Sequence, residues 1–165
     1  FKYKDQLQSD LAVAFGGRVA EDIVFKRIST GASNDIKQAT DLAQKMIRVW
    51  GMSEKLGPLS YAKEEEQIFL GREISQHRDY SEATAKKIDD EVNKLIGEAY
   101  EKATAVLKEN IDILHKLAES LLEKETVLGA ELDELITSMR PGIELPSLAT
   151  AEKEEPDKAA SESGE

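Results

Sequence analysis

The sequence has no cysteine among its 165 residues. This absence excludes disulfide frameworks, zinc sites with cysteine ligands and thiol nucleophiles. The sequence also lacks any apolar run of the roughly 18–20 residues that a membrane-spanning helix needs. Its 40% apolar and 33% charged residues are typical of a soluble, helix-rich globular protein, and its length favours one domain with a sizeable core.

Basic residues are outnumbered, and the formal net charge is −11. A protein that binds nucleic acid needs clustered lysine and arginine to contact phosphates, so we expect no nucleic-acid partner. Much of the negative charge is local, because residues 141–165 carry seven acids and two lysines. That stretch is rich in Pro, Glu, Lys, Ser and Ala, and it predicts a disordered acidic tail.

Histidine is scarce as well, with only His77 and His115. Neither has a second histidine four residues away, and no HExxH, GxSxG, GxxxxGK[ST] or GxGxxG motif is present. We therefore read both imidazoles as solvated side chains. The chain by itself lacks the parts of a complete catalytic site.

Apolar residues repeat at helical spacing over most of residues 1–140, which predicts a mainly α fold. Residues 3–15 form one such pattern, Gly16-Gly17 interrupts it, and residues 19–24 resume it. A strong amphipathic pattern ends near Gly51 and uses Ile36, Ala39, Ala43, Met46, Ile47 and Trp50.

The second half predicts one β element and three further helices. Residues 59–61 and 67–70 are short β-prone runs, so we expect a small hairpin near 58–72. A long helix begins after the N-cap Ser81, and Asn110 separates it from the next helix. Their apolar stripes predict a long antiparallel helix pair, followed by a short helix over 130–139.

The stretch STGASNDI, residues 29–36, places one acid, Asp35, where a helix begins. A carboxylate in the first helical turn meets the positive end of the helix macrodipole, a gain of roughly 0.3–1 kcal/mol. Position alone therefore favours an ordinary helix-start acid, with Ser33 or Asn34 as the N-cap. Glu21, beside Asp22, has a similar interpretation as a solvated acid.

Three segments taken together resemble the peptidase domain of the FtsH family. The members of this family are membrane-anchored, ATP-dependent zinc metalloproteases. They are LAVAFGGRVAEDIVF (11–25), STGASNDIKQATDLAQKMIRVWGMSEKLGPLSY (29–61) and IFLGRE (68–73). The resemblance continues through ENIDILHKLAESLLEKET (109–126) and covers nearly residues 1–140. It implies that residues 1–140 are the C-terminal portion of the peptidase domain.

The resemblance also implies a zinc site. In this family two histidines of an HExxH helix and a downstream aspartate bind the metal, and the matching aspartate here is Asp35. Glu21 is the less favoured alternative ligand, and we assign it to supporting contacts. The HExxH helix, with its general-base glutamate, lies before Phe1 in the family layout, so no catalytic residue is expected within this fragment.

For the intact protein, the resemblance implies an endopeptidase that degrades membrane and soluble polypeptides for quality control. It implies a homo-hexamer, ATP and Mg bound by an AAA+ module upstream, and an N-terminal anchor at the cytoplasmic face of the bacterial inner membrane. The fragment itself is expected to be soluble and inactive alone. An alternative is a non-enzymatic helical module in which residues 81–139 serve interaction or oligomerisation.

Overall fold

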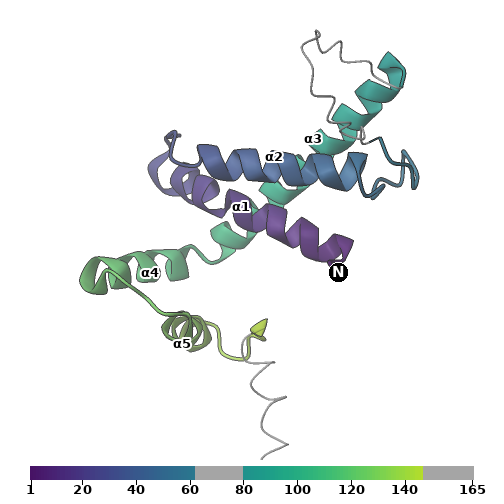
Figure 1. The fold of residues 1–165 in the computed structure, drawn as a ribbon. Helices are drawn as coiled ribbons and strands as arrows, with labels where there is room; N and C mark the ends of the chain where they lie inside the picture. Colours follow the sequence, from purple (N-terminus) through teal and green to yellow (C-terminus); the bar gives the residue numbers. More distant parts are fainter. Residues whose placement is uncertain (62–79, 147–165) are drawn as a thin grey trace, which may run out of the picture. The chain divides into compact units, whose positions relative to one another are not determined.

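The computed structural model describes residues 1–61 and 80–146, and within these residues the fold is entirely helical. Within these described residues, five helices follow one another in sequence order (Figure 1). They are α1 (Lys4–Phe25), α2 (Ser33–Arg48), α3 (Glu82–Glu109), α4 (Ile111–Lys124) and α5 (Gly129–Met139). The prediction of a mainly α fold is confirmed. The chain divides into two compact units, residues 1–109 and residues 110–165, which are described separately below.

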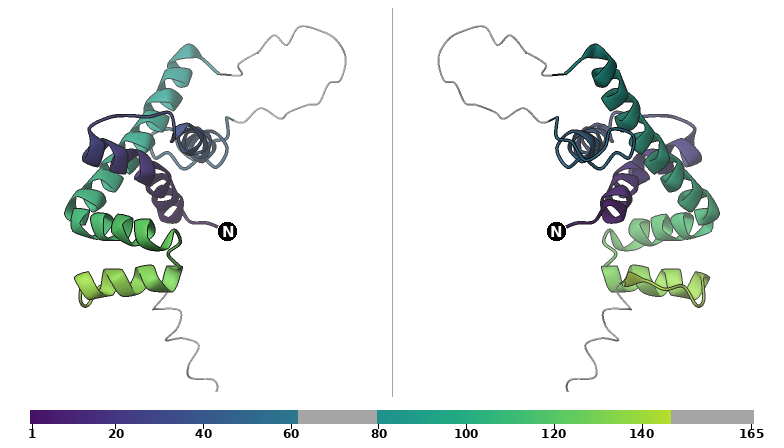
Figure 2. Two further views of the ribbon diagram at one scale, coloured as in Figure 1. Left: turned by 90° about the vertical axis from the view of Figure 1, so that its left-hand side faces the viewer. Right: turned by 90° about the vertical axis from the view of Figure 1, so that its right-hand side faces the viewer.

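The core of the first unit lies where α3 packs against both α1 and α2 (Figures 1 and 2). Each helix contributes apolar residues spaced three or four apart, so that they share one face. Full burial of such a side chain stabilises the fold by about 1.5–3 kcal/mol. The buried residues are Leu7, Leu11, Phe15 and Val19 of α1; Ala39, Ala43, Met46 and Ile47 of α2; and Ile88, Val92, Leu95, Ala99 and Ala103 of α3.

Helix α1 continues through Gly16-Gly17, so the predicted interruption is wrong. A glycine inside a helix costs about 1 kcal/mol relative to alanine. Phe15 and Val19, on either side of the pair, are both buried on the face that meets the other helices. Because their burial depends on an unbroken helix, packing overrides the local preference of the glycines.

Helix α2 ends earlier than its apolar pattern suggests. The helix stops at Arg48, and Trp50, the last residue of the predicted stripe, is 46% exposed. Gly51 follows with a φ of +59°, a conformation in which glycine is not strained. A Cβ on Gly51 would also lie 3.2 Å from the backbone N and O of Leu59. Gly51 therefore lets the chain turn back closely against the helix end.

The predicted β-hairpin near 58–72 is not supported. Its first run, residues 59–61, has no strand structure, and its second run, 67–70, lies outside the described residues. The N–H of Tyr61 instead donates a 2.6 Å hydrogen bond to the carbonyl of Arg48. The ring of Tyr61 meets that of Tyr80 edge to face, with centroids 5.5 Å apart, and Nη2 of Arg48 donates to the Tyr80 hydroxyl at 3.3 Å.

The predicted antiparallel pair of residues 81–109 with the following helix would join the two units, and it stays a prediction. Within the first unit the apolar stripe of α3 is covered by α1 and α2, and within the second unit α4 contacts α5. Spacing along one helix shows which face is apolar but not which other helix will cover it. The boundary itself was predicted correctly, because α3 ends at Glu109 and Asn110 is the N-cap of α4.

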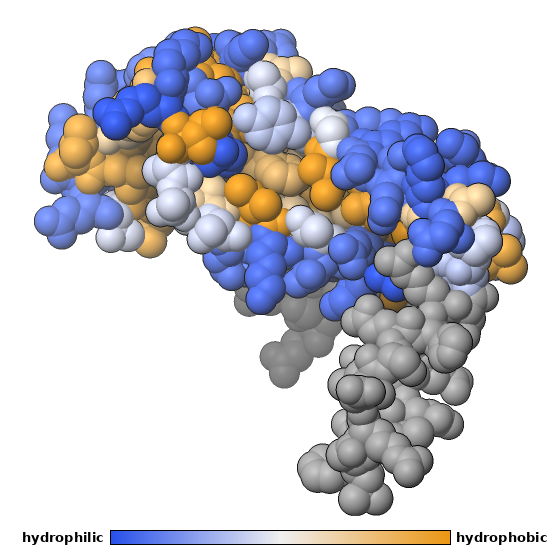
Figure 3. Space-filling model, turned by 90° about the horizontal axis from the view of Figure 1, so that it is seen from above, coloured by the Kyte–Doolittle hydropathy of each residue, from blue (hydrophilic) through white to orange (hydrophobic). Residues whose placement is uncertain are grey.

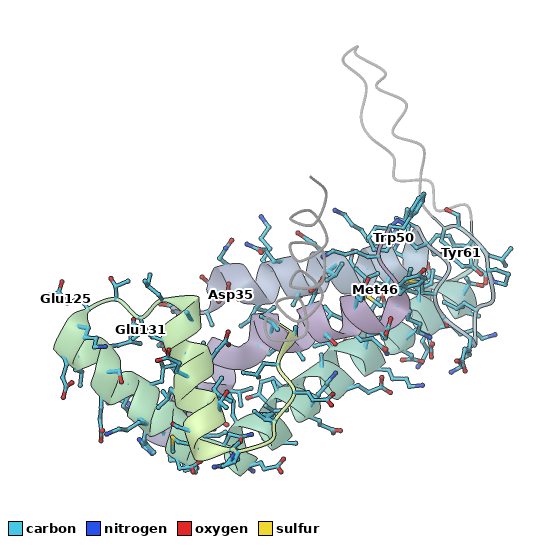
Figure 4. The ribbon with its side chains drawn as sticks, turned by 90° about the horizontal axis from the view of Figure 1, so that it is seen from below. Asp35, Met46, Trp50, Tyr61, Glu125 and Glu131 are labelled. Atoms are coloured by element: carbon cyan, nitrogen blue, oxygen red, sulfur yellow. The ribbon has the colours of Figure 1, made fainter. Side chains whose placement is uncertain are left out.

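The second unit consists of α4, α5 and the turn after them as far as Pro146. Arg140 donates from Nη2 and Nη1 to the two carboxylate oxygens of Asp112, at 2.8 and 3.0 Å. Lys124, near the end of α4, pairs with Glu131 in the first turn of α5 at 2.9 Å (Figure 4). The predicted tail, 141–165, falls outside the described residues from 147 onward. None of the described helices has the length and apolar character needed to cross a membrane.

Candidate functional site

Asp35 is the third residue of α2 and lies at one end of that helix, opposite the end that carries Met46 and Trp50 (Figure 4). Its side chain is exposed, and no hydrogen bond or ion pair to it is found within the described residues. The N-cap position is held by Ala32 without any side-chain cap, so neither Ser33 nor Asn34 has the predicted capping role. The carboxylate is thus placed by the helix start alone and is open to an external partner.

The connection between α1 and α2 is fastened to α1 through Ser29. Nη1 of Arg18 donates a 3.0 Å hydrogen bond to the Ser29 carbonyl. The Ser29 hydroxyl lies 2.9 Å from both carboxylate oxygens of Glu21, to which it donates, and it accepts the N–H of Gly31 at 3.1 Å. These contacts hold the chain just before the first turn of α2.

The need for glycine at residue 31 is explained by the closeness of the Ser29 hydroxyl and not by an unusual backbone angle. A Cβ at residue 31 would lie 3.2 Å from the Ser29 hydroxyl and 3.8 Å from Oε1 of Glu21. The first of these distances is tighter than ordinary van der Waals contact. A larger residue would push the Ser29 hydroxyl away from its position, so the small size of Gly31 follows from the packing of Ser29.

The start of α2 is secured by two further contacts. The N–H of Ser33 donates to the carbonyl of Thr30 at 3.1 Å, and that of Ile36 donates to the carbonyl of Ala32 at 3.0 Å. Ala32 itself is only 6% exposed. A buried residue next to a hydrogen-bonded turn fixes where the helix begins, and this also fixes the position of Asp35 three residues later.

A complete metal site is not found in the described part of the chain. No group of three or more His, Cys, Asp or Glu side chains there is arranged to hold an ion. His115 is exposed on α4, and His77 lies outside the described residues. Asp35 offers one oxygen donor, which suits zinc, but a zinc site normally has three or four protein ligands. The described residues can therefore supply one ligand of a zinc site, Asp35.

Glu21 is placed differently from Asp35. Its carboxylate is half-buried and is engaged by the Ser29 hydroxyl. Reasoning from the sequence did not identify Ser29 or Arg18, since their partners lie eight and eleven residues away on another element. The only signal in the sequence was the crowding of small residues in STGAS, which favours close contacts without naming them.

A groove in the described part of the first unit lies away from Asp35, which is not among its lining residues. The groove is open, has a volume of about 660 Å³ and lies beside the C-terminal end of α2. Its lining mixes three lysines with three glutamates and includes the buried Ser53. This balance of charge selects no ligand of either sign, and no functional role is assigned to the groove.

Apolar residues reach the surface between hydrophilic ones in the space-filling view (Figure 3). Phe25, the last residue of α1, is 68% exposed, and Ile28, in the connection that follows, is 61% exposed. The chain between the end of α1 and the start of α2 therefore presents apolar surface that the described residues do not cover.

Comparison with known proteins matches residues 1–135 to the model of peptidase family M41. Proteins named ATP-dependent zinc metalloprotease FtsH are similar to the chain. That of Acidobacterium capsulatum is 50% identical over 88% of this chain and 22% of its own length. FtsH 1 of Thermomicrobium roseum is 48% identical over the same shares, and FtsH of Magnetococcus marinus is 48% identical over 82% and 20%.

The chain spans about a fifth of the length of these curated relatives. The family match, in contrast, covers most of the chain and includes both the α1–α2 connection and α3. The resemblance inferred from STGASNDI and the neighbouring segments is confirmed. The chain belongs to peptidase family M41, the family of the FtsH-type zinc metalloproteases.

Proposed function

We propose that this chain is the C-terminal part of the peptidase domain of an ATP-dependent zinc metalloendopeptidase. The intact enzyme degrades membrane and soluble polypeptides for quality control. One observation carries the proposal: the family match spans residues 1–135, and within it Asp35 stands exposed at a well-fixed helix start.

Within that enzyme, Asp35 is the third zinc ligand, and two histidines of an HExxH helix earlier in the longer protein complete the set. Bound zinc supplies a Lewis acid that polarises the scissile peptide carbonyl. The contribution of this chain is to hold the Asp35 carboxylate still, through the α1–α2 connection and the packing of α2 on α3. The exposed Phe25 and Ile28 support this arrangement, because a covering segment would bury them.

The remaining parts of the proposal concern the longer protein. An AAA+ module uses ATP and Mg to deliver the substrate, six copies form the working assembly, and an N-terminal anchor holds it at the cytoplasmic face of the inner membrane. The names of the relatives, which describe ATP-dependent zinc metalloproteases, support the use of ATP, and the six copies and the anchor rest on the family resemblance alone.

The isolated chain is expected to be inactive. A single carboxylate binds zinc weakly because the other donors are missing, and the general base is expected on the HExxH helix. The test compares the 165-residue chain with the longer protein that carries it, using unfolded casein as substrate. Chelator-sensitive cleavage of casein by the isolated chain would overturn this part of the proposal.

The role of Asp35 is tested in the longer protein with Asp35→Asn. Proteolysis should fall below detection while ATP hydrolysis continues, since the substitution removes a zinc ligand and ATP is proposed to bind a separate module. Asp41→Asn is the matched control, because Asp41 is another exposed acid of α2. Full proteolysis by the Asp35→Asn variant would exclude the ligand role.

A further inference from the structure

We propose that Ser29 and Glu21 are positioning residues for Asp35, acting through a tether between α1 and the start of α2. The tether is the set of hydrogen bonds that Ser29 makes with Arg18, Glu21 and Gly31. This inference rests on the proposed function for the identity of the metal ligand. The tether itself stands on the geometry of the chain.

Ser29 is the centre of the tether because both its backbone and its side chain are used. Its carbonyl accepts from Arg18, one turn before Glu21 on α1. Its hydroxyl donates to Glu21 and accepts from the N–H of Gly31. One residue thus links α1 to the backbone that enters the first turn of α2.

Asp35 needs such support because no hydrogen bond or ion pair within the described residues holds its side chain directly. Its place depends on where α2 begins, and the N-cap residue Ala32 makes no side-chain cap. Metal ligands must be held to within about 0.5 Å of the productive geometry, which requires supporting hydrogen bonds. The Ser29 tether and the turn from Thr30 to Ser33 supply this support.

The same contacts favour a positioning role for Glu21 over a role as a zinc ligand. The Ser29 hydroxyl lies 2.9 Å from both carboxylate oxygens of Glu21. A metal that took either oxygen would compete with this hydrogen bond and loosen the connection that places Asp35. The geometry therefore assigns Glu21 to the tether and leaves Asp35 as the exposed donor.

The tether is tested first in the 165-residue chain, without any metal, by amide hydrogen exchange. Ser29→Ala removes the acceptor of the Gly31 N–H, so this amide should exchange roughly 2- to 10-fold faster. Ser29→Thr keeps a hydroxyl and should restore the protection. Ser33→Ala is the matched control, because Ser33 lies in the same stretch but caps nothing. Unchanged exchange at Gly31 in Ser29→Ala would overturn the tether.

The positioning role is then tested in the longer protein by competition for zinc with a chelator. Loss of a supporting hydrogen bond typically weakens metal affinity by about 10- to 100-fold. Ser29→Ala should show this loss with an unchanged ATPase rate, and Ser29→Thr should recover the affinity. Glu21→Gln should have the smaller effect, because its amide oxygen still accepts from Ser29.

The outcomes distinguish the competing assignments. If Glu21 is itself a ligand, Glu21→Gln will lose zinc more severely than Ser29→Ala, and the positioning role is wrong. If Asp35→Asn keeps full zinc affinity, the proposed function fails, whatever the exchange at Gly31 shows. If Asp35→Asn loses zinc but Ser29→Ala binds it normally, the positioning proposal alone fails.

Discussion

Ser53 donates a 2.6 Å hydrogen bond from its hydroxyl to Oε2 of Glu91, joining the chain after α2 to the middle of α3. The Ser53 hydroxyl also accepts the N–H of Leu56 at 3.1 Å. Ser53 is 5% exposed, and Glu91 and Leu56 are partly buried, so both bonds lie at the edge of the core. This polar contact fixes the turn that Gly51 begins against the apolar core.

Replacing Ser53 with alanine should destabilise the chain by about 1–3 kcal/mol, because a partly buried amide N–H and a carboxylate lose a partner at the same time. Urea unfolding followed by circular dichroism measures this free energy. Ser9→Ala is the control, since the Ser9 hydroxyl is exposed and bonds to the carbonyl of Asp5 one turn earlier. Equal urea midpoints for Ser53→Ala and the unaltered chain would show that the hydrogen bonds of Ser53 contribute nothing to stability.

Leu11→Ala should cost about 2–5 kcal/mol, because Leu11 is 0% exposed at the centre of the core and truncation leaves a cavity. Val13→Ala, two residues away on the opposite side of α1, should change stability by no more than about 0.5 kcal/mol. Val13 is 79% exposed. Similar losses for the two variants in thermal unfolding would contradict the packing described for α1.

Gly17→Ala should stabilise the isolated chain by up to about 1 kcal/mol. Gly17 lies inside α1, and a Cβ there would meet no atom within 4 Å. Gly51→Ala should have the opposite sign, because residue 51 has a φ of +59° and backbone atoms of Pro58 and Leu59 lie 3.2 Å from the added Cβ. Melting temperatures that moved in the same direction would refute this contrast.

Acid should weaken the contact between α4 and α5. The hydrogen bond from Arg140 lowers the pKa of Asp112 below its ordinary 3.8, and that from the Leu128 N–H, helped by Lys124, lowers the pKa of Glu131 below 4.5. A carboxyl group whose pKa is lower in the folded chain than in the unfolded chain stabilises the fold. This stabilisation is complete at pH values above the ordinary pKa, and it is lost as the pH falls through the lowered, folded-state pKa. Both contributions should therefore be complete at pH 6 and fade below about pH 4.5.

Side-chain carboxyl chemical shifts across an NMR pH titration measure both groups directly. Arg140→Gln removes the guanidinium and should return the Asp112 midpoint towards its ordinary value, without moving that of Glu131. An unaltered Asp112 midpoint in this variant would show that Arg140 is not the cause of the shift.

The sequence correctly predicted the helices whose regularly spaced apolar residues form one buried face. The stripe Ala39, Ala43, Met46 and Ile47 is buried as expected, and the stripe of α3 from Ile88 to Ala103 is buried as well. The prediction was wrong at Gly16-Gly17, where tertiary packing outweighs a local cost of about 1 kcal/mol per glycine. Periodicity did not indicate that α1 and α2 would cover the stripe of α3, because it carries no information on partners.

The candidate site, too, could be predicted from the sequence only in part. Position alone favoured a helix-start acid for Asp35, and only the match over the surrounding segments suggested a metal ligand. The role of Ser29 depends on distances to Arg18 and Glu21 across a loop, which spacing along the chain does not provide. Contacts of this kind become visible only when both elements have been placed.

The meeting of Tyr61 and Tyr80 has a practical consequence for protein engineering. The two rings meet edge to face with centroids 5.5 Å apart, although the residues lie far apart in the sequence. Arg48 contacts both residues, through its carbonyl to the N–H of Tyr61 and through its guanidinium to the Tyr80 hydroxyl. Because Tyr80→Phe would keep the ring and remove only the hydroxyl that accepts from Arg48, the ring contact and the hydrogen bond can be altered separately at this junction.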